Sequence, residues 1–218
     1  MILVPVKNLT DAKQRLASLL DAGERSALAA AMLEDVLETL ATWPECPPVA
    51  VITGDSRANR LARRFSFEVI RDDANGGETD AIAMATRVCE SNGVTSTLVL
   101  PGDIPLLQAR ELEEIYVAAP SEGAVLVPAS DGRGTNAALR RPAALFPLRF
   151  GNDSFLPHVS AARATGKACA ILRLPGIGLD VDTPADLWRL LAQAGQTRAQ
   201  QLLRAWGVTQ RLALVPER

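Results

Sequence analysis

Short apolar runs alternate with segments of helical periodicity along almost the whole chain, and no other feature constrains the fold as strongly. In the segment that Asp21 can cap, Leu28, Met32, Val36 and Leu40 recur every four residues and form one apolar stripe. The alternation predicts an α/β protein with a mainly parallel central sheet flanked by helices. We expect strands over residues 2–6, 49–53, 67–71, 97–100, 124–129, 137–140 and 168–174. We expect helices over residues 21–41, 56–65, 79–91, 108–119 and 188–206, and a further helix that ends near residue 165.

Length and composition limit the classes of protein that this chain can belong to. Its 218 residues, without repeats or a low-complexity tract, fit a single domain over residues 1–218. A content of 48% hydrophobic and 22% charged residues is typical of a globular protein. A net charge of −2 without a basic run argues against a nucleic-acid partner. The apolar runs are too short to cross a bilayer and residues 1–7 do not resemble a signal peptide, so we expect a cytoplasmic protein without membrane association.

The cysteines and the single histidine argue against two common kinds of metal site. Cys46, Cys89 and Cys169 are odd in number and widely spaced, which indicates a reduced protein without a cysteine metal site. His158 is the only histidine, so a site with several histidines cannot form within one chain. It follows Pro157 and has no evident nucleophile nearby, and we interpret it as a helix histidine whose hydrogen bonds are satisfied within the protein.

One acid directly follows a predicted buried strand. The run 98–100 stops at the turn signal Pro101-Gly102, and Asp103 comes next. In open α/β sheets, ligands bind beyond the carboxyl ends of the strands. Asp103 is therefore placed to hold a hard cation such as Mg²⁺ over a phosphate. The same residue could instead simply start the following helix, as aspartate often does.

A second acidic segment precedes a strong helix start. Asp180 and Asp182 lie two residues apart, just before Thr183-Pro184, which has the pattern of an N-cap followed by the first helical residue. If the segment is extended, both carboxylates face the same side, where like charges repel unless a cation lies between them. The alternative is a pair of solvent-facing acids that the helix dipole favours.

The lysines are few and concentrated near the start of the chain. Only Lys7, Lys13 and Lys167 occur, and the first two lie with Arg15 in a polar loop after the first predicted strand. Loops in this position commonly bind phosphates in α/β proteins. Each of these residues could alternatively be an ordinary surface charge.

A second candidate phosphate loop contains paired glycines. Gly76 and Gly77 precede a predicted helix, where they would let backbone N–H groups approach a ligand or would simply form a tight turn. The chain contains neither a Walker A motif nor a GxGxxG dinucleotide fingerprint. Acids for a metal, together with cations for phosphates, predict phosphoryl or nucleotidyl transfer.

Five motifs, taken in order, resemble the 2-phospho-L-lactate guanylyltransferase family, which also contains phosphoenolpyruvate and 3-phospho-D-glycerate guanylyltransferases. The likeness covers essentially the whole chain, and its last two motifs together are the most specific. The motifs are Pro5-Val6-Lys7 with Ala12-Lys13-Gln14-Arg15-Leu16, Gly102-Asp103-Ile104-Pro105-Leu106-Leu107, Gly134-Thr135-Asn136, Phe150-Gly151-Asn152-Asp153-Ser154, and Asp180-Val181-Asp182-Thr183-Pro184-Ala185-Asp186-Leu187.

The resemblance implies a single Rossmann-like nucleotidyltransferase domain of the GT-A type. It also implies the use of GTP and Mg²⁺ in making the deazaflavin coenzyme factor 420. The metal aspartates of the family match Asp103, Asp180 and Asp182, and its contacts to the acceptor carboxylate match Thr135, Gly151 and Ser154. One departure is that several relatives have Gly-Leu-Asn where this chain has Gly77-Glu78-Thr79-Asp80.

The expected reaction joins GTP to a small phosphorylated three-carbon acid and releases pyrophosphate. We expect Asp103, Lys13 and Arg15 to be catalytic, and the nucleotide to contact these three together with Lys7, Gly76 and Gly77. Two alternatives stay open: a related nucleotidyltransferase that acts on a sugar phosphate or the molybdenum cofactor, and a non-catalytic nucleotide-binding module. The choice among three-carbon acceptors, the selection of guanine over adenine, and a homodimeric state are also left open by these residues.

Overall fold

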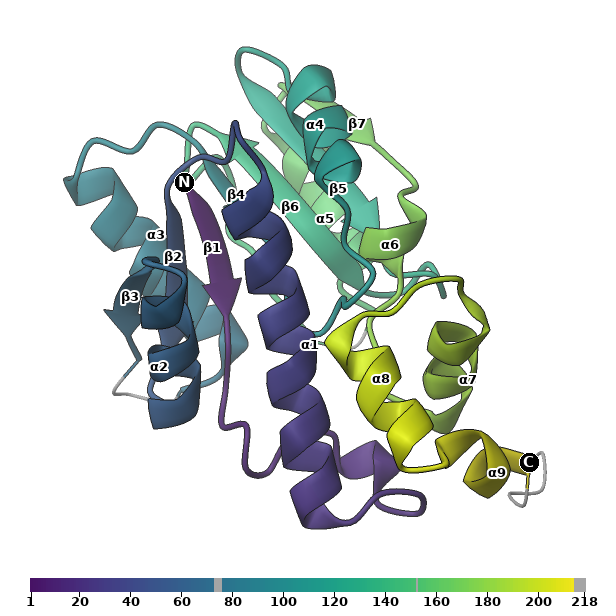
Figure 1. The fold of residues 1–218 in the computed structure, drawn as a ribbon. Helices are drawn as coiled ribbons and strands as arrows, with labels where there is room; N and C mark the ends of the chain where they lie inside the picture. The colour runs from purple at the N-terminus through teal and green to yellow at the C-terminus, as the bar shows by residue number, and fades with distance from the viewer. Residues whose placement is uncertain (73–75, 152, 214–218) are drawn as a thin grey trace.

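The computed structural model describes residues 1–72, 76–151 and 153–213, and over these residues seven strands form one sheet (Figure 1). The strand order is β3-β2-β1-β4-β6-β5-β7. The strands are β1 (Ile2–Pro5), β2 (Val49–Thr53), β3 (Glu68–Arg71), β4 (Thr97–Val99), β5 (Gly123–Pro128), β6 (Thr135–Arg141) and β7 (Ala168–Ile171). Each predicted strand is present. The largest differences in length are at β6, which begins two residues before and ends one residue after the predicted range, and at β7, which ends three residues before the predicted end.

One strand runs against its neighbours. β1, β2, β3 and β4 pair in parallel, and so do β5 and β7, whereas β6 is antiparallel to both β4 and β5. Val99 near the end of β4 pairs with Ala138, so the start of β6 extends past the carboxyl end of β4. The mainly parallel sheet is confirmed, and the reversal of β6 brings Thr135 and Asn136 to the edge of the sheet where parallel strands end.

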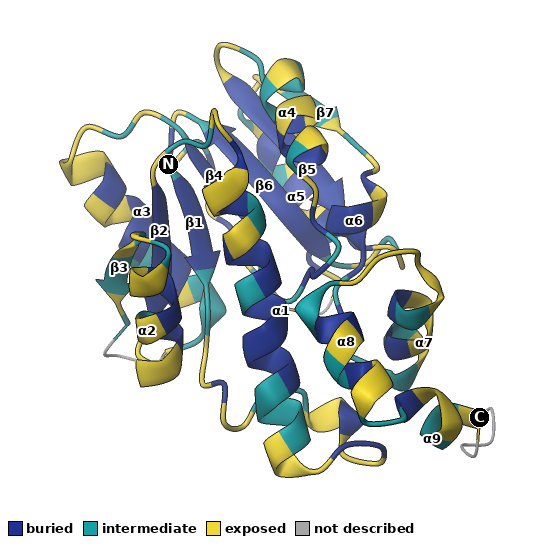
Figure 2. Ribbon diagram, viewed as in Figure 1, coloured by how far each residue is buried: buried dark blue, intermediate teal, exposed yellow. Residues whose placement is uncertain are grey.

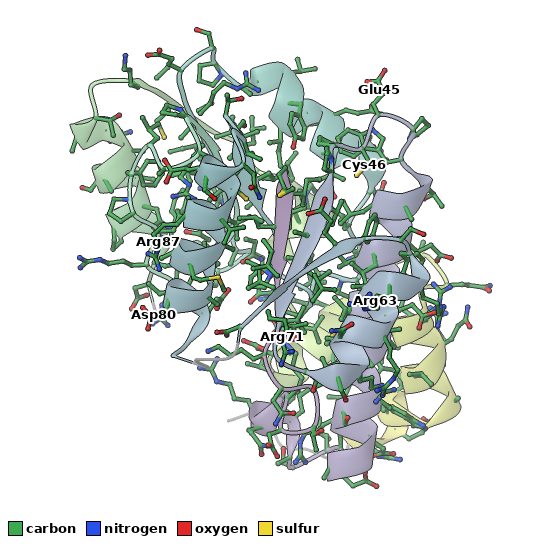
Figure 3. The ribbon with its side chains drawn as sticks, turned by 90° about the vertical axis from the view of Figure 1, so that its left-hand side faces the viewer. Glu45, Cys46, Arg63, Arg71, Asp80 and Arg87 are labelled. Carbon is green, nitrogen blue, oxygen red and sulfur yellow. The ribbon has the colours of Figure 1, made fainter. Side chains whose placement is uncertain are left out.

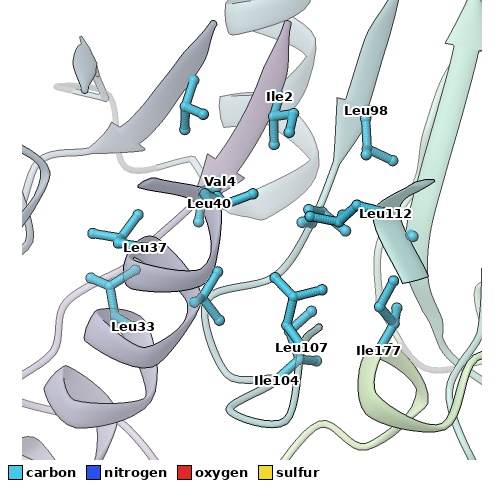
Figure 4. Close-up of a cluster of buried hydrophobic side chains, with 14 of the residues drawn as sticks. Ile2, Val4, Leu33, Leu37, Leu40, Leu98, Ile104, Leu107, Leu112 and Ile177 are labelled. Carbon is cyan, nitrogen blue, oxygen red and sulfur yellow. The ribbon is translucent and has the colours of Figure 1, made fainter. Parts of the chain in front are cut away.

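Helices cover both faces of the sheet, and alternate strand residues point to the two sides. α1, α2, α4 and α6 pack on one face around Ile2, Val4 and Leu98, as Figure 4 shows for part of this cluster. α3 and α5 pack on the other face around Leu3 and Val99. In Figure 2 the inner strands are almost wholly buried, whereas the edge strands β3 and β7 and the outer sides of the helices are partly exposed. The helices are α1 (Ala22–Thr42), α2 (Ser56–Arg64), α3 (Glu78–Ser91), α4 (Ala109–Ala118), α5 (Phe155–Ala164), α6 (Pro175–Gly178), α7 (Pro184–Ala192), α8 (Arg198–Ala205) and α9 (Val208–Ala213).

The N-terminus of α1 confirms the predicted cap. The Asp21 carboxylate accepts a hydrogen bond from the Glu24 N–H, and the Glu24 side chain accepts one from the Asp21 N–H, which together form a capping box. The predicted apolar stripe of this helix is buried throughout. None of the helices in the described part of the chain is long and apolar enough to span a bilayer.

The C-terminal region differs from the continuous helix predicted over residues 188–206. Gly195 has φ = 141°, a backbone conformation that a helix cannot include and that favours glycine. Thr197 then caps a new helix with Gln200, so the segment divides into α7 and α8. α7, α8 and α9 gather beside α1 (Figure 1) and close a third apolar cluster around Leu28, Met32 and Leu187.

Asp35 ties this C-terminal group to α1. Its carboxylate is 7% exposed and accepts hydrogen bonds from the backbone N–H groups of Arg198 (2.8 Å) and Ala199 (3.0 Å) in the first turn of α8. We expect Asp35→Ala to lower the free energy of unfolding by about 2 kcal/mol, because two buried donors lose a charged acceptor. Urea denaturation measures this loss. Glu38→Ala, which removes the more exposed partner of Arg198, is the control and should cost under about 1 kcal/mol; equal losses would contradict the capping role.

Candidate active site

The carboxyl ends of β1 and β4 open onto a cleft of about 290 Å³ at the edge of the sheet. The loop after β1 forms one wall, and the turn after β4 and the start of α3 contribute to the others. Both positively and negatively charged side chains line the cleft, which is the composition expected of a site that binds a nucleotide and a metal ion together. The charged lining residues are Lys7, Asp11, Lys13, Glu78, Asp103 and Asp182.

Lys13 lies between two of the predicted metal aspartates. Its ammonium donates to Asp103 Oδ2 at 2.6 Å and to Asp182 Oδ1 at 2.8 Å, and its side chain is only 8% exposed. Lys13 has left-handed backbone angles (φ 56°, ψ 42°) just before the short 3₁₀ turn η1 (Gln14–Leu16). Arg15 is further out, with Nη1 3.8 Å from Asp182 Oδ2. Two of the three cations predicted to meet phosphates, Lys13 and Arg15, therefore pair here with the acids.

Lys13 and its aspartate partners each favour the charged form of the other. Burial alone would lower the pKa of Lys13, but the carboxylates of Asp103 and Asp182 outweigh burial and raise it. Burial alone would raise the pKa of Asp182, but the Lys13 ammonium outweighs it and lowers that pKa. Both groups are therefore charged at neutral pH, and two carboxylate oxygens converge on one positive charge.

The third predicted metal ligand, Asp180, has a different partner. The Asn136 side-chain amide donates to Asp180 Oδ1 at 3.0 Å and to the carbonyl of Ile177 at 2.9 Å. Over the described ranges, no three acidic, histidine or cysteine side chains form a group that could hold a metal ion, so the three-aspartate metal site stays a prediction. Burial raises the pKa of Asp180. The hydrogen bond from Asn136 lowers this pKa, and the negative charge of Asp103 raises it further. The backbone bond from Val181 N–H to the Asp103 carbonyl (3.1 Å) nevertheless holds the two acidic segments side by side.

The predicted acceptor residues Thr135 and Ser154 contact each other. The Thr135 N–H donates to Ser154 Oγ at 3.1 Å, and both side chains are buried. The Thr135 hydroxyl also bonds to His158 Nδ1 at 2.9 Å, and His158 Nε2 accepts from the Arg149 N–H at 2.8 Å. The interpretation of His158 as a satisfied helix histidine is confirmed, and burial lowers its pKa to about 4. The Thr135 N–H is therefore already used within the protein.

Gly151 lies in a bend that precedes α5. Its φ of 147° favours glycine, and a Cβ placed there would meet no atom within 4 Å. The preceding residue, Phe150, exchanges hydrogen bonds with the Thr79 hydroxyl in the first turn of α3. Thr135, Gly151 and Ser154 do not line the cleft described above, and Asn152 of the same motif lies outside the described residues.

The glycine-rich loop places a different residue in the cleft. Gly77 is the N-cap of α3, and neither it nor Gly76 lines the cleft, whereas Glu78 does. Burial raises the pKa of Glu78 to about 7, the Asp103 charge adds to this, and Lys7 opposes it. Residues 73–75 of this loop lie outside the described residues. The sequence interpretation missed both Glu78 and Asn136, although each stands inside a motif that it singled out.

Comparison with known proteins identifies the family. A family model described as "Guanylyl transferase CofC like" matches residues 1–217. The chain belongs to this family. It is therefore a nucleotidyltransferase enzyme. It is 37% identical over 202 residues to a phosphoenolpyruvate guanylyltransferase of Roseiflexus castenholzii, covering 93% of this chain and 92% of the relative. It is 31% identical to a 2-phospho-L-lactate guanylyltransferase of Methanothermobacter thermautotrophicus, covering 93% and 88%.

Solved structures confirm the fold of this guanylyl transferase family member. A candidate nucleotide-diphospho-sugar transferase from Desulfovibrio desulfuricans G20 superposes with a TM-score of 0.78 at 19% identity and 96% coverage of both chains. A CMP:2-keto-3-deoxy-manno-octonic acid synthetase solved with CTP superposes with a TM-score of 0.58 at 15% identity, covering 88% of this chain and 96% of the other. At these identities the likeness concerns the fold alone. The expected nucleotidyltransferase fold is thereby confirmed.

Proposed function

We propose that this enzyme transfers the guanylyl group of GTP to the phosphate of a three-carbon phospho-acid and releases pyrophosphate. The family match over residues 1–217 is the observation that carries the proposal. The relatives described above are named for phosphoenolpyruvate and 2-phospho-L-lactate, and 3-phospho-D-glycerate is a third acceptor of the same size. The product would enter the biosynthesis of the deazaflavin coenzyme factor 420.

The donor set at the cleft suits Mg²⁺. Asp103 and Asp182 direct two carboxylate oxygens at one ammonium ion, and carboxylate oxygens are the protein ligands that Mg²⁺ prefers. We therefore propose that these two residues hold the ion, with Asp180 as the further ligand that the resemblance implies. When bound, Mg²⁺ would offset the negative charge of the triphosphate.

The acceptor needs no general base for this reaction. Its phosphate is largely ionised at neutral pH, since the second pKa of a phosphate monoester is ~6. One of its oxygens forms a bond to the α-phosphorus of GTP, and the bond from that phosphorus to the pyrophosphate oxygen breaks. What the protein must supply is in-line positioning and relief from charge repulsion. Lys7, Lys13 and Arg15 would supply that relief at the triphosphate.

The acceptor carboxylate would bind near Thr135, Gly151 and Ser154. The structure supports a role for Ser154 in shaping this region, because its hydroxyl oxygen holds the Thr135 N–H. At Gly151, no atom lies within 4 Å of the position that a Cβ would occupy, so no side chain covers the backbone on that side. Neutral donors would carry this recognition and would make it depend strongly on geometry.

We expect Ser154→Ala to raise the KM for the acceptor severalfold and to leave the KM for GTP nearly unchanged. The same change should lower the free energy of unfolding by about 1–2 kcal/mol, because the buried Thr135 N–H loses its acceptor. Steady-state kinetics with each substrate varied separately, together with urea denaturation, measure both effects. Ser130→Ala, at an exposed loop residue, is the matched control. A raised KM for GTP with an unchanged acceptor KM would show that the region is assigned to the wrong substrate.

A panel of acceptors tests the proposed reaction directly. Wild-type enzyme is incubated with GTP or ATP, Mg²⁺ and one of the three phospho-acids, and pyrophosphate release is followed. We expect release with GTP and at least one of the acids. Release only with a sugar phosphate would favour a related transferase, and GTP binding without release for any acceptor would favour a binding module. Either result would overturn the proposal.

A further inference from the structure

Glu78 is an acid turned into the cleft without a partner. Four carboxyl groups in the described part of the chain have a pKa raised chiefly by burial. Three of them accept hydrogen bonds: Asp35 from the start of α8, Glu111 from Gly176 and Gln108, and Asp180 from Asn136. The Glu78 side chain takes part in no hydrogen bond or ion pair with any described residue. No hydrogen bond in the described protein therefore offsets its burial, and only the more distant charges of Lys7 and Lys13 oppose it.

Helix formation does not require this orientation. An acid in the first turn of a helix is favoured by the helix dipole wherever its side chain points. Asp80, two residues along the same first turn, is exposed and points away from the protein, as does Arg87 two turns further along the same face (Figure 3). Glu78 instead lines the cleft, where desolvation works against its charge. A ligand that donates hydrogen bonds would offset that cost.

The chemistry of the proposed substrates limits what can meet Glu78. The phosphates and the acceptor carboxylate are anionic acceptors, so a carboxylate repels them, while Lys7 and Lys13 in the same cleft attract them. The remaining donors are the ribose hydroxyls and the guanine base. Guanine carries N1–H and the N2 amine side by side on one edge, which matches the two oxygens of one carboxylate. Adenine has an acceptor at N1 and no N2 amine. Val6, Ala12 and Met32 add apolar lining that suits a planar base.

We propose that Glu78 is the residue that selects guanine, by accepting hydrogen bonds from N1–H and the N2 amine of GTP. The inference rests on the proposed use of GTP and extends it to the base. It assigns Glu78 a specificity role toward the base and leaves the reaction at the phosphates to Lys7, Lys13, Arg15 and the proposed Mg²⁺.

Equilibrium binding without acceptor tests this role. Wild type, Glu78→Gln and Glu78→Ala are titrated by calorimetry with GTP, ITP, ATP and 2′-deoxy-GTP at pH 8 in Mg²⁺. ITP keeps N1–H but lacks the N2 amine. We expect wild type to prefer GTP, and each variant to bind GTP roughly 10- to 100-fold more weakly, with the differences among GTP, ITP and ATP largely lost. Glu90→Gln, an exposed glutamate on the same helix, is the matched control and should bind like wild type.

Several results would overturn the inference. Equal weakening of GTP, ITP and ATP would mean that Glu78 acts on the phosphates, the metal or the fold. If the variants lose only the difference in affinity between GTP and 2′-deoxy-GTP, then Glu78 contacts the ribose and not the base. Retained guanine preference in both variants, or no preference in wild type, would remove the role altogether. Guanine-selective binding through Glu78 without pyrophosphate release for any acceptor would overturn the proposed reaction and leave this inference standing.

Discussion

Replacing Asp103 with asparagine is expected to lower kcat by roughly 10²–10³-fold or more while the protein stays folded. The Asp103 carboxylate lies in the cleft, 2.6 Å from the Lys13 ammonium, and we propose that it holds Mg²⁺. Asparagine keeps the shape of the side chain but loses its charge, and a neutral amide is a much poorer Mg²⁺ ligand than a carboxylate. The side chain is 30% exposed, so the substitution leaves no deeply buried unpaired group that would unfold the protein.

Pyrophosphate release at saturating GTP and acceptor measures the loss, and circular dichroism with thermal melting checks the fold. The control is Glu122→Gln, which makes the same change from acid to amide at an exposed residue. Glu122 precedes β5 and therefore lies at the opposite edge of the sheet from the cleft. Near-normal turnover in a well-folded Asp103→Asn protein would remove Asp103 from the catalytic site.

Replacing Lys13 with alanine is expected to affect both stability and substrate use. Without the ammonium, the carboxylates of Asp103 and Asp182 face each other with no cation between them. In the absence of divalent metal we expect the free energy of unfolding to fall by about 2 kcal/mol, less than for a fully buried pair because the acids are 30% and 41% exposed. We also expect a raised KM for GTP, because a cation is lost from the triphosphate region. Added Mg²⁺ should restore more stability to the variant than to wild type.

Urea denaturation in chelator and in Mg²⁺, together with GTP kinetics, tests this prediction. Lys167→Ala removes an exposed pair with Glu122 and should change stability by no more than about 0.5 kcal/mol. If both lysine variants behave alike and Mg²⁺ stabilises neither, then Lys13 is an ordinary surface charge with no link to the metal region.

Local signals in the sequence predicted most of the fold. Asp21 with Glu24 and Thr183 with Pro184 each form the expected helix start, because capping depends only on residues within one turn. The prediction was wrong where longer-range structure decided the outcome. Thr135 and Asn136 are polar and follow a glycine, so they resembled a loop, yet pairing with Pro128 extends the strand over them. Gly195 was passed over within a helical pattern, although α7 ends at Ala192 and the backbone angle of Gly195 excludes a continuous helix through this segment.

The candidate site was predicted in its residue types but not in its pairings. Lys13 lies 90 residues from Asp103 and 169 from Asp182, so no local pattern could show that they meet. A lysine after the first strand indicates phosphate binding. Only the fold shows that the Lys13 ammonium donates to the carboxylates of Asp103 and Asp182. Asn136 and Glu78 were missed for a similar reason. An amide in a glycine-rich loop and an acid at a helix start both have ordinary local explanations, and the contacts that distinguish them come from other parts of the chain.

The attachment of α7, α8 and α9 has a consequence for how the enzyme loses activity. Asp182 immediately precedes the capping box of α7, and this helix packs in the third apolar cluster rather than against the sheet. Proteins open locally in cooperative units, and short terminal helices are drawn from the less stable end of that range. Detachment of these three helices would carry Asp182 away from Lys13 while the strands stay paired. We therefore expect catalytic activity to be lost on heating before the sheet unfolds, and stabilising substitutions in these three helices to extend the active lifetime more than substitutions in the sheet.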